Sequence, residues 1–140
     1  MYGFLNIESP CMPERAPLLT PDRVLIVEDE AWIAMEVEEE VRNLGCQRTF
    51  LAYHQQQALD AIDTFQPDFA IVDVALTGTG VNYDIADALA ERSIPFMFSS
   101  GHRPGDVPDR HRNHPFVSKP MQSSEFAQAI VFALGSDNLA

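Results

Sequence analysis

Apolar residues fall into two patterns that alternate along the chain. Short, nearly continuous apolar runs are typical of strands buried on both faces of a sheet. Between these runs, apolar residues recur every three or four positions, which predicts helices. We expect strands near 24–27, 49–52, 69–72, 95–98 and 115–118. We expect helices near 30–44, 55–65 and 84–92, and a last helix that Ser123 or Ser124 caps.

This alternation predicts one α/β domain, built on a doubly wound five-stranded parallel sheet with helices on both faces. We assign the strand order 2-1-3-4-5 by analogy with known sheets of this kind, which puts the reversal of strand order between the first and third strands. Ligands bind at such a point, in the crevice beyond the carboxyl ends of the strands.

Three segments depart from the alternation. Residues 1–21 hold four of the ten prolines and no apolar periodicity, so we expect a flexible extension before a domain at 22–135 and a short tail at 136–140. The segment 102–114 is rich in proline, glycine, arginine and histidine, and Val107 is its only aliphatic residue. We therefore expect a short, irregular and mobile segment in place of a helix between the fourth and fifth strands.

Charge and composition exclude several classes of function. The net charge is −12 at neutral pH, and nucleic acids and anionic membranes are bound through basic patches, so we expect neither as a partner. No apolar run approaches the ~18 residues of a membrane span, and the first residues lack the basic start of a signal peptide. Cys11 and Cys46 show no metal-ligand spacing, so we expect free thiols in a reducing, cytoplasmic compartment.

The expected strands end in side chains with complementary chemistry. Glu28 and Asp29 follow the first strand, and Asp73 follows the third. Ser100 follows the fourth strand and Lys119 the fifth, so all five side chains should meet at one edge of the sheet. Clustered carboxylates repel one another unless they share a cation, and Mg²⁺ accepts carboxylate, water and phosphate oxygens. With Mg²⁺, Lys119 and Ser100 to stabilise a transferring phosphoryl group, the edge is suited to phosphoryl transfer onto Asp73.

Other functions common in α/β sheets lack residues that they need. A phosphatase or phosphomutase of the haloacid-dehalogenase type needs a second acid two residues after its nucleophile, where this chain has Ala75. Dinucleotide binding needs a glycine-rich turn after the first strand, a place taken by Glu28, Asp29 and Glu30. The chain also has no Gly-Lys-Ser/Thr phosphate loop.

Four segments together resemble the receiver domain of two-component response regulators, over about residues 22–135. They are VLIVEDE (24–30), FAIVDV (69–74), PFMFSSG (95–101) and FVSKP (116–120). The resemblance implies a flavodoxin-like receiver fold in which Asp73 accepts the phosphoryl group. It also implies that Asp29 binds Mg²⁺ directly, that Glu28 acts in the outer sphere of the ion, and that the Ala75 carbonyl is a further ligand.

The resemblance also implies which residues change conformation or contacts on phosphorylation. It implies Ser100 as the switch hydroxyl and Lys119 as the cation that contacts the phosphoryl group. His102 and Phe116 occupy further switch positions, with core packing as the alternative role of Phe116.

Some positions depart from the family pattern. Family members commonly have two aspartates at the Glu28-Asp29 pair and often threonine at Ser100, and both changes keep the chemistry. The stretch PFMFSSGH also resembles a Phe-Ala-Thr-Gly-Tyr-like motif of mostly stand-alone α-proteobacterial regulators. Ser99, Ser100 and His102 depart from that motif.

The implied function is that of a single-domain response regulator. It would be a phosphoacceptor rather than an enzyme, although it would assist its own phosphorylation and dephosphorylation. We expect a sensor histidine kinase or histidine phosphotransferase and a downstream protein target as partners, and a monomer or weak dimer. We expect no output domain after Ala140, and therefore expect the signal to leave by protein contact or phosphorelay. The alternative is a receiver-like interaction module that is not phosphorylated.

The remaining aromatic and imidazole side chains suggest no further site. Trp32 is expected to be partly buried in the packing of the first helix. His54, His111 and His114 show no ligand spacing and are expected at the surface.

Overall fold

Five parallel strands form the centre of the protein, in the order β2-β1-β3-β4-β5. The structure, a computed structural model, describes residues 21–73, 83–100, 109–111, 114–118 and 123–139. Its strands are β1 (Arg23–Val27), β2 (Arg48–Ala52), β3 (Phe69–Asp73), β4 (Phe96–Ser100) and β5 (Phe116–Ser118). The α/β class and the strand order 2-1-3-4-5 predicted from the sequence are therefore confirmed.

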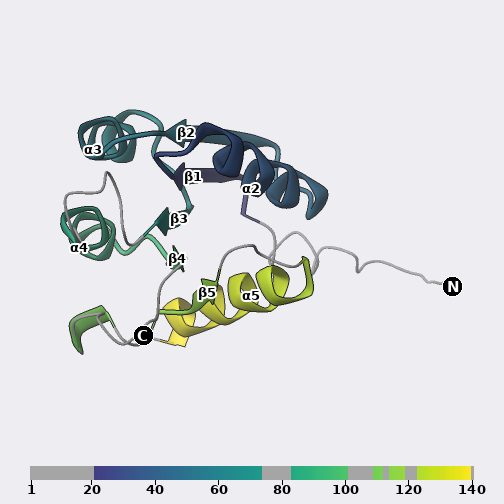
Figure 1. Cartoon of the computed structure of the whole chain (residues 1–140). Helices are drawn as coiled ribbons and strands as arrows, with labels where there is room; N and C mark the ends of the chain where they lie inside the picture. The colour runs from purple at the N-terminus through teal and green to yellow at the C-terminus, as the bar shows by residue number, and fades with distance from the viewer. Residues whose placement is uncertain (1–20, 74–82, 101–108, 112–113, 119–122, 140) are drawn as a thin grey trace, which may run out of the picture.

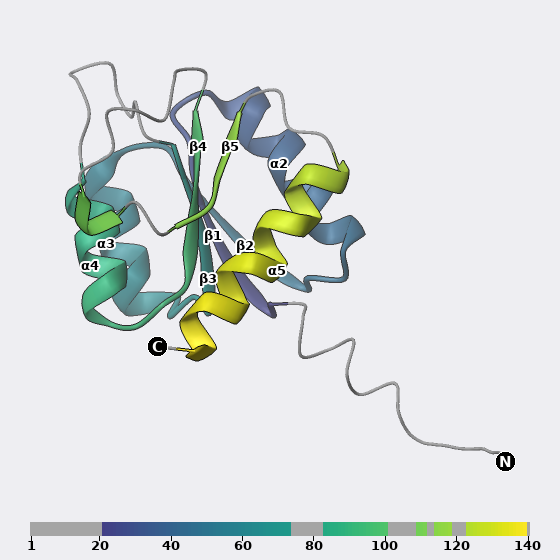
Figure 2. The ribbon, with the colours of Figure 1, turned by 90° about the horizontal axis from the view of Figure 1, so that it is seen from below.

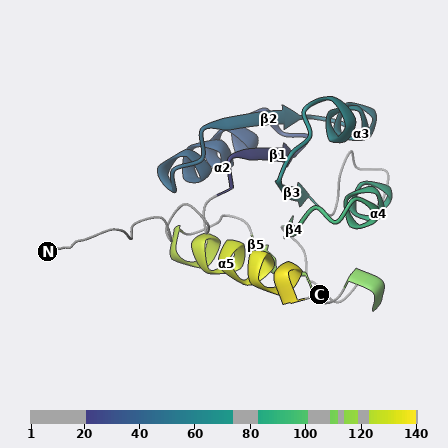
Figure 3. The same ribbon diagram turned by 180° about the vertical axis from the view of Figure 1, so that it is seen from behind.

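Two pairs of helices cover the two faces of the sheet. α3 (Gln55–Thr64) and α4 (Asp84–Glu91) lie on one face, and α2 (Ala31–Asn43) and α5 (Ser123–Leu139) lie on the other (Figures 1 and 2). Figure 3 shows the same layers from behind. A three-residue 3-10 turn, η3 (Asp109–His111), precedes β5. Among the described residues, no helix has both the length and the apolar character needed to cross a membrane.

The strands read as continuous apolar runs because their side chains alternate between two cores. On β1, Leu25 and Val27 pack with the buried residues of α3 and α4. Val24 and Ile26 face the other way and pack with the buried residues of α2 and α5. All four side chains are almost fully buried, so neither face of β1 tolerates a polar residue.

Local signals set the ends of several helices. α2 ends just before Gly45, whose φ of 108° is a conformation that glycine adopts without steric cost. α3 is capped by His54, whose Nδ1 accepts a hydrogen bond from the backbone N–H of Gln57 at 3.2 Å. α5 begins at Ser123, within one residue of its expected cap, and continues to Leu139, past the boundary expected at residue 135.

One carboxylate joins the start of β1 to the start of β3. Asp68 accepts hydrogen bonds from the backbone N–H groups of Asp22 and Arg23, at 3.1 and 3.0 Å. Pro21 is buried, so ordered structure reaches one residue further toward the N-terminus than the expected boundary at 22. Residues 1–20 lie outside the described residues, and the flexible extension stays a prediction.

The segment 102–114, expected to replace a helix between β4 and β5, is described only in part. Residues 109–111 form η3, and 101–108 and 112–113 lie outside the described residues. The described part is short and not α-helical, as the prolines and the lack of apolar residues predict. The expected mobility of 102–114 stays a prediction.

Candidate functional site

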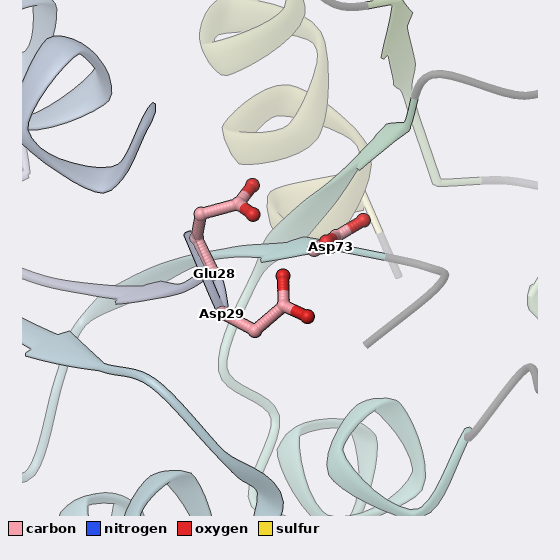
Figure 4. Close-up of side chains that lie close together, drawn as sticks. All are labelled: Glu28, Asp29 and Asp73. Atoms are coloured by element: carbon pink, nitrogen blue, oxygen red, sulfur yellow. The ribbon is translucent and has the colours of Figure 1, made fainter. Parts of the chain in front are cut away.

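Three carboxyl groups meet at the carboxyl edge of the sheet. Glu28 and Asp29 directly follow β1, and Asp73 is the last residue of β3. One carboxylate oxygen from each residue lies within 4.8 Å of the others, and Figure 4 shows the three groups gathered around a common space. The meeting of these side chains, which the sequence predicts from adjacent strand ends, is thus present in the structure.

The sheet register brings these residues together. Val27 of β1 pairs with Val72 of β3, so the residues that follow them, Glu28 and Asp73, reach the edge at the same height. The backbone N–H of Glu28 also donates to the carbonyl of Ala52 at 2.9 Å, which carries the β1–β2 ladder one residue past the strand. The Glu28 backbone is therefore held between two strands.

The turn after β1 is fixed by a side chain within it. Glu28 Oε2 accepts a hydrogen bond from the backbone N–H of Glu30 at 3.2 Å. Glu28 is 2% exposed and Asp73 is 4% exposed, whereas Asp29 is exposed. The site therefore has two carboxylates set into the protein and a third on the solvent side, where an ion or a phosphoryl donor can approach.

The donor set fits a small hard cation. All three groups in the cluster offer carboxylate oxygen and none offers nitrogen or sulfur, a preference shared by Mg²⁺, Mn²⁺ and Ca²⁺. Negative charges this close repel one another strongly when they are partly shielded from water, and a bound cation removes that cost. Asp29 and Asp73 could bind such an ion directly, with Glu28 close enough to act on its water ligands.

The other predicted site residues are described incompletely or not at all. Ala75, His102 and Lys119 lie outside the described residues. For Ser100 in β4 and Phe116 in β5 the structure describes the backbone alone. Their proposed contacts with a phosphoryl group stay predictions, although both strands end at the edge that carries the three carboxylates.

The structure adds Ser99 to the neighbourhood of Asp73. The two residues are paired across β3 and β4, and Ser99 is buried. A role was predicted for Ser100 and none for Ser99, because a strand that ends in two serines does not reveal its register. The pairing of Phe98 with Phe116, which sets the β4–β5 register, could not be read from the sequence either.

Two expectations about ring side chains are wrong. His111 is not a surface residue, since it is 2% exposed, and His114 is partly buried with its ring stacked on Phe96 at 3.9 Å. Trp32 is 63% exposed rather than partly buried. The buried face of α2 carries Ala34, Val37 and Val41, and Trp32 lies nearly opposite that face.

The local environment of His111 explains its burial. Its Nε2 lies 2.7 Å from a carboxylate oxygen of Asp87 in α4, a partner 24 residues away in the sequence. No periodic pattern marks a contact of this kind, so the signal was absent from the sequence.

Comparison with known proteins gives a consistent picture, although no family model matches the chain. The chain is 30% identical over 123 residues to the transcriptional regulatory protein PdtaR of Mycobacterium tuberculosis. The aligned residues cover 85% of this chain and 60% of PdtaR. It is similar to the solution structure of SdrG from Sphingomonas melonis Fr1, with 34% identity and a TM-score of 0.72 over 81% of this chain and 96% of SdrG.

A second similar structure is the receiver domain of the PhyR response regulator from Erythrobacter litoralis. The identity is 28% and the TM-score is 0.68, over 81% of this chain and 90% of that domain. The chain thus spans nearly all of two solved relatives and about 60% of the length of the curated relatives that it matches.

Proposed function

Because the chain belongs to the response-regulator receiver family, we propose that it accepts a phosphoryl group on Asp73 in a Mg²⁺-dependent reaction. The observation that carries this proposal is the buried Asp73 carboxylate at a strand end, with the carboxylates of Glu28 and Asp29 within 4.8 Å. The relatives named above are regulators, which supports a signalling role.

Among the three carboxylates, Asp73 is the best nucleophile. Its backbone is part of β3, paired with β4 on one side, so its carboxylate is held in place. Glu28 already accepts a hydrogen bond from the backbone of Glu30, which ties its carboxylate to the turn. Asp29 is exposed and suits a group that meets a hydrated ion.

In the proposed reaction, a carboxylate oxygen of Asp73 attacks the phosphorus of a phosphorylated histidine or a small acyl phosphate. A P–O bond to Asp73 forms as the bond to the leaving group breaks, which gives an acyl phosphate. Asp29, Asp73 and the Ala75 carbonyl would hold Mg²⁺, and Glu28 would bind its water ligands. When bound, Mg²⁺ supplies positive charge against the phosphoryl oxygens.

Ser100 and Lys119 complete the proposed chemistry. Lys119, directly after β5, would pair with the phosphoryl group as a point charge. Ser100, the last residue of β4, would donate a hydrogen bond to the same group, and His102 and Phe116 would respond to its movement. These roles rest on the family resemblance and on the position of both strand ends.

We propose that the phosphorylated protein passes on its signal through contact with another protein. The phosphoryl group would come from a sensor histidine kinase or a histidine phosphotransferase in the cytoplasm, and the phosphorylated domain would bind a downstream protein or pass the group on. The second candidate is a receiver-like interaction module that is never phosphorylated, and the compact carboxylate cluster argues against it.

Labelling with acetyl phosphate and Mg²⁺, followed by intact-mass and Phos-tag analysis, tests the proposal. The wild-type protein should gain one phosphoryl group, and Asp73→Asn should gain none. The control is Asp63→Asn, which removes an exposed aspartate on α3 and should be labelled like the wild type. Equal labelling of Asp73→Asn would refute the assignment, and an unlabelled wild type would favour the interaction module.

A further inference from the structure

The η3 turn is attached to α4 through a single carboxylate. Both carboxylate oxygens of Asp87 in α4 accept hydrogen bonds from the Arg110 guanidinium. Arg110 Nε donates to Oδ1 at 2.9 Å and Nη2 donates to Oδ2 at 3.1 Å. His111 Nε2 lies 2.7 Å from the same Oδ1. Two consecutive side chains of the turn therefore converge on one residue of the helix.

The state of Asp87 decides the tautomer of His111. The hydrogen bond from Arg110, and after it that from His111, lowers the pKa of Asp87 to about 2. At neutral pH the carboxylate is ionised and can only accept, so His111 Nε2 must carry a hydrogen and donate it. His111 Nδ1 is buried and has no hydrogen-bond partner among the described residues.

Ring contacts hold the buried imidazole in place. The His111 ring stacks on Tyr83 with centroids 6.0 Å apart, and it meets Phe96 and Phe98 edge-on at 5.8 and 6.1 Å. His114 lies at 5.7 Å. Phe96 and Phe98 belong to the core beneath α3 and α4, so η3 covers one side of that core.

The ion pair that attaches η3 to α4 is partly exposed to water. A three-residue 3-10 turn has little stability of its own, because its hydrogen-bond geometry is poor. Its attachment depends on Asp87, whose side chain is 40% exposed, and on Arg110, whose side chain is 58% exposed. Water can compete for both, so the turn should open more readily than the sheet beneath it.

We propose that the Asp87–His111 contact is a latch that holds the η3 turn closed over Phe96 and Phe98. When the latch opens, the turn leaves α4 and bares this aromatic surface while the sheet stays intact. The contacts of the latch are formed without a phosphoryl group on Asp73, and the proposed function does not require them.

Amide hydrogen exchange of the whole chain tests the latch. Asp87→Ala removes the acceptor, and His111→Phe keeps a buried ring but removes the Nε2–H donor. Both should speed exchange in peptides covering 109–114 about fivefold or more, with little change in β1 and β3. Arg110→Ala, which removes only an exposed ion pair, should have a smaller effect.

Asp63→Asn is the matched control, because it breaks the 2.6 Å ion pair between Asp63 and Arg92 without touching the latch. It should leave exchange in 109–114 at the wild-type rate. Unchanged exchange in folded Asp87→Ala would overturn the proposal. So would an equal rise in β1 and β3, because opening would then be global unfolding.

A measurement on the wild-type protein covers the case in which the variants do not fold. Long-range ¹H–¹⁵N spectra should show His111 as the Nε2–H tautomer, with an Nε2 proton that exchanges slowly with water. An Nδ1–H tautomer, or fast exchange of that proton, would contradict the latch.

Discussion

Asp73 and Ser99 are paired directly across β3 and β4, and both side chains are buried at the carboxyl edge of the sheet. Ser100, the predicted switch residue, is one position further along β4 and is paired with Ser118 of β5. Neighbouring residues of a strand face opposite sides of the sheet. Ser99 and Ser100 therefore differ in their position relative to Asp73, and substitution of each serves as a control for the other.

Ser100→Ala should separate phosphorylation from the conformational response. We expect this variant to be labelled on Asp73 but to lose most of the NMR shift changes that beryllofluoride and Mg²⁺ cause at Val117 of β5, because it lacks the hydroxyl that we propose contacts the phosphoryl group. Ser99→Ala should retain them. The reverse result would assign the switch to Ser99.

Asp29→Ala should weaken Mg²⁺ binding by more than about 100-fold, since it removes the carboxylate that we propose as a direct ligand of this strongly hydrated ion. Trp32, exposed on the first turn of α2 three residues later, is a suitable fluorescence probe for the titration. Glu36→Ala removes an exposed carboxylate from the same helix and should leave the binding curve unchanged. A wild-type curve in Asp29→Ala would disprove the ligand role.

Asp87 should make folding stability depend on pH in the acid range. Its pKa is about 2 in the folded protein, below the ordinary value of 3.8, so its contribution is complete above about pH 4 and is lost as the pH falls toward 2. The charged or titratable side chains that act on it are Arg110 and His111, and Asp84 and Tyr83 act in turn on Arg110.

Urea unfolding of wild type and Asp87→Asn should therefore differ by about 1 kcal/mol at pH 6, because the carboxylate is 40% exposed and solvent screens the pair. The difference should shrink toward zero near pH 2. A difference that stays constant from pH 6 to pH 2 would show that the charge of Asp87 contributes nothing.

Beryllofluoride with Mg²⁺ should change amide exchange in 102–114, because this segment follows Ser100 and a hydroxyl drawn toward Asp73 would pull on its first residues. The same addition to Asp73→Asn should change nothing. Strong and equal protection of 102–114 in the wild type with and without beryllofluoride would mean that the segment is inert.

The sheet was predictable because its strands are buried on both faces. Runs such as Phe69–Val72 contain no polar residue, and the polar residues after them mark the strand ends. The carboxylate cluster followed from the same reasoning, since Glu28, Asp29 and Asp73 stand at the ends of two strands that the expected order makes neighbours.

Features that depend on long-range geometry were not predictable. His111 lies in a stretch with no apolar pattern, and its burial comes from Asp87 and from rings on β4. The exposure of Trp32 depends on which side of α2 packs, and a large aromatic side chain next to Ile33 suggested the wrong side. Whether Ser99 or Ser100 is paired with Asp73 depends on the register between β3 and β4, and a shift of one residue would exchange the two serines.

The position of β1 between β2 and β3 has a consequence for synthesis on the ribosome. β1 is the first strand to be made, yet its neighbours are β2 and β3, and the Asp68 carboxylate that receives its first N–H groups is 46 residues downstream of Asp22. A nascent chain that ends before β3 leaves the backbone N–H and C=O groups along one edge of β1 without a partner, which favours aggregation. The carboxylate cluster can therefore assemble only after Asp73 has emerged from the ribosome.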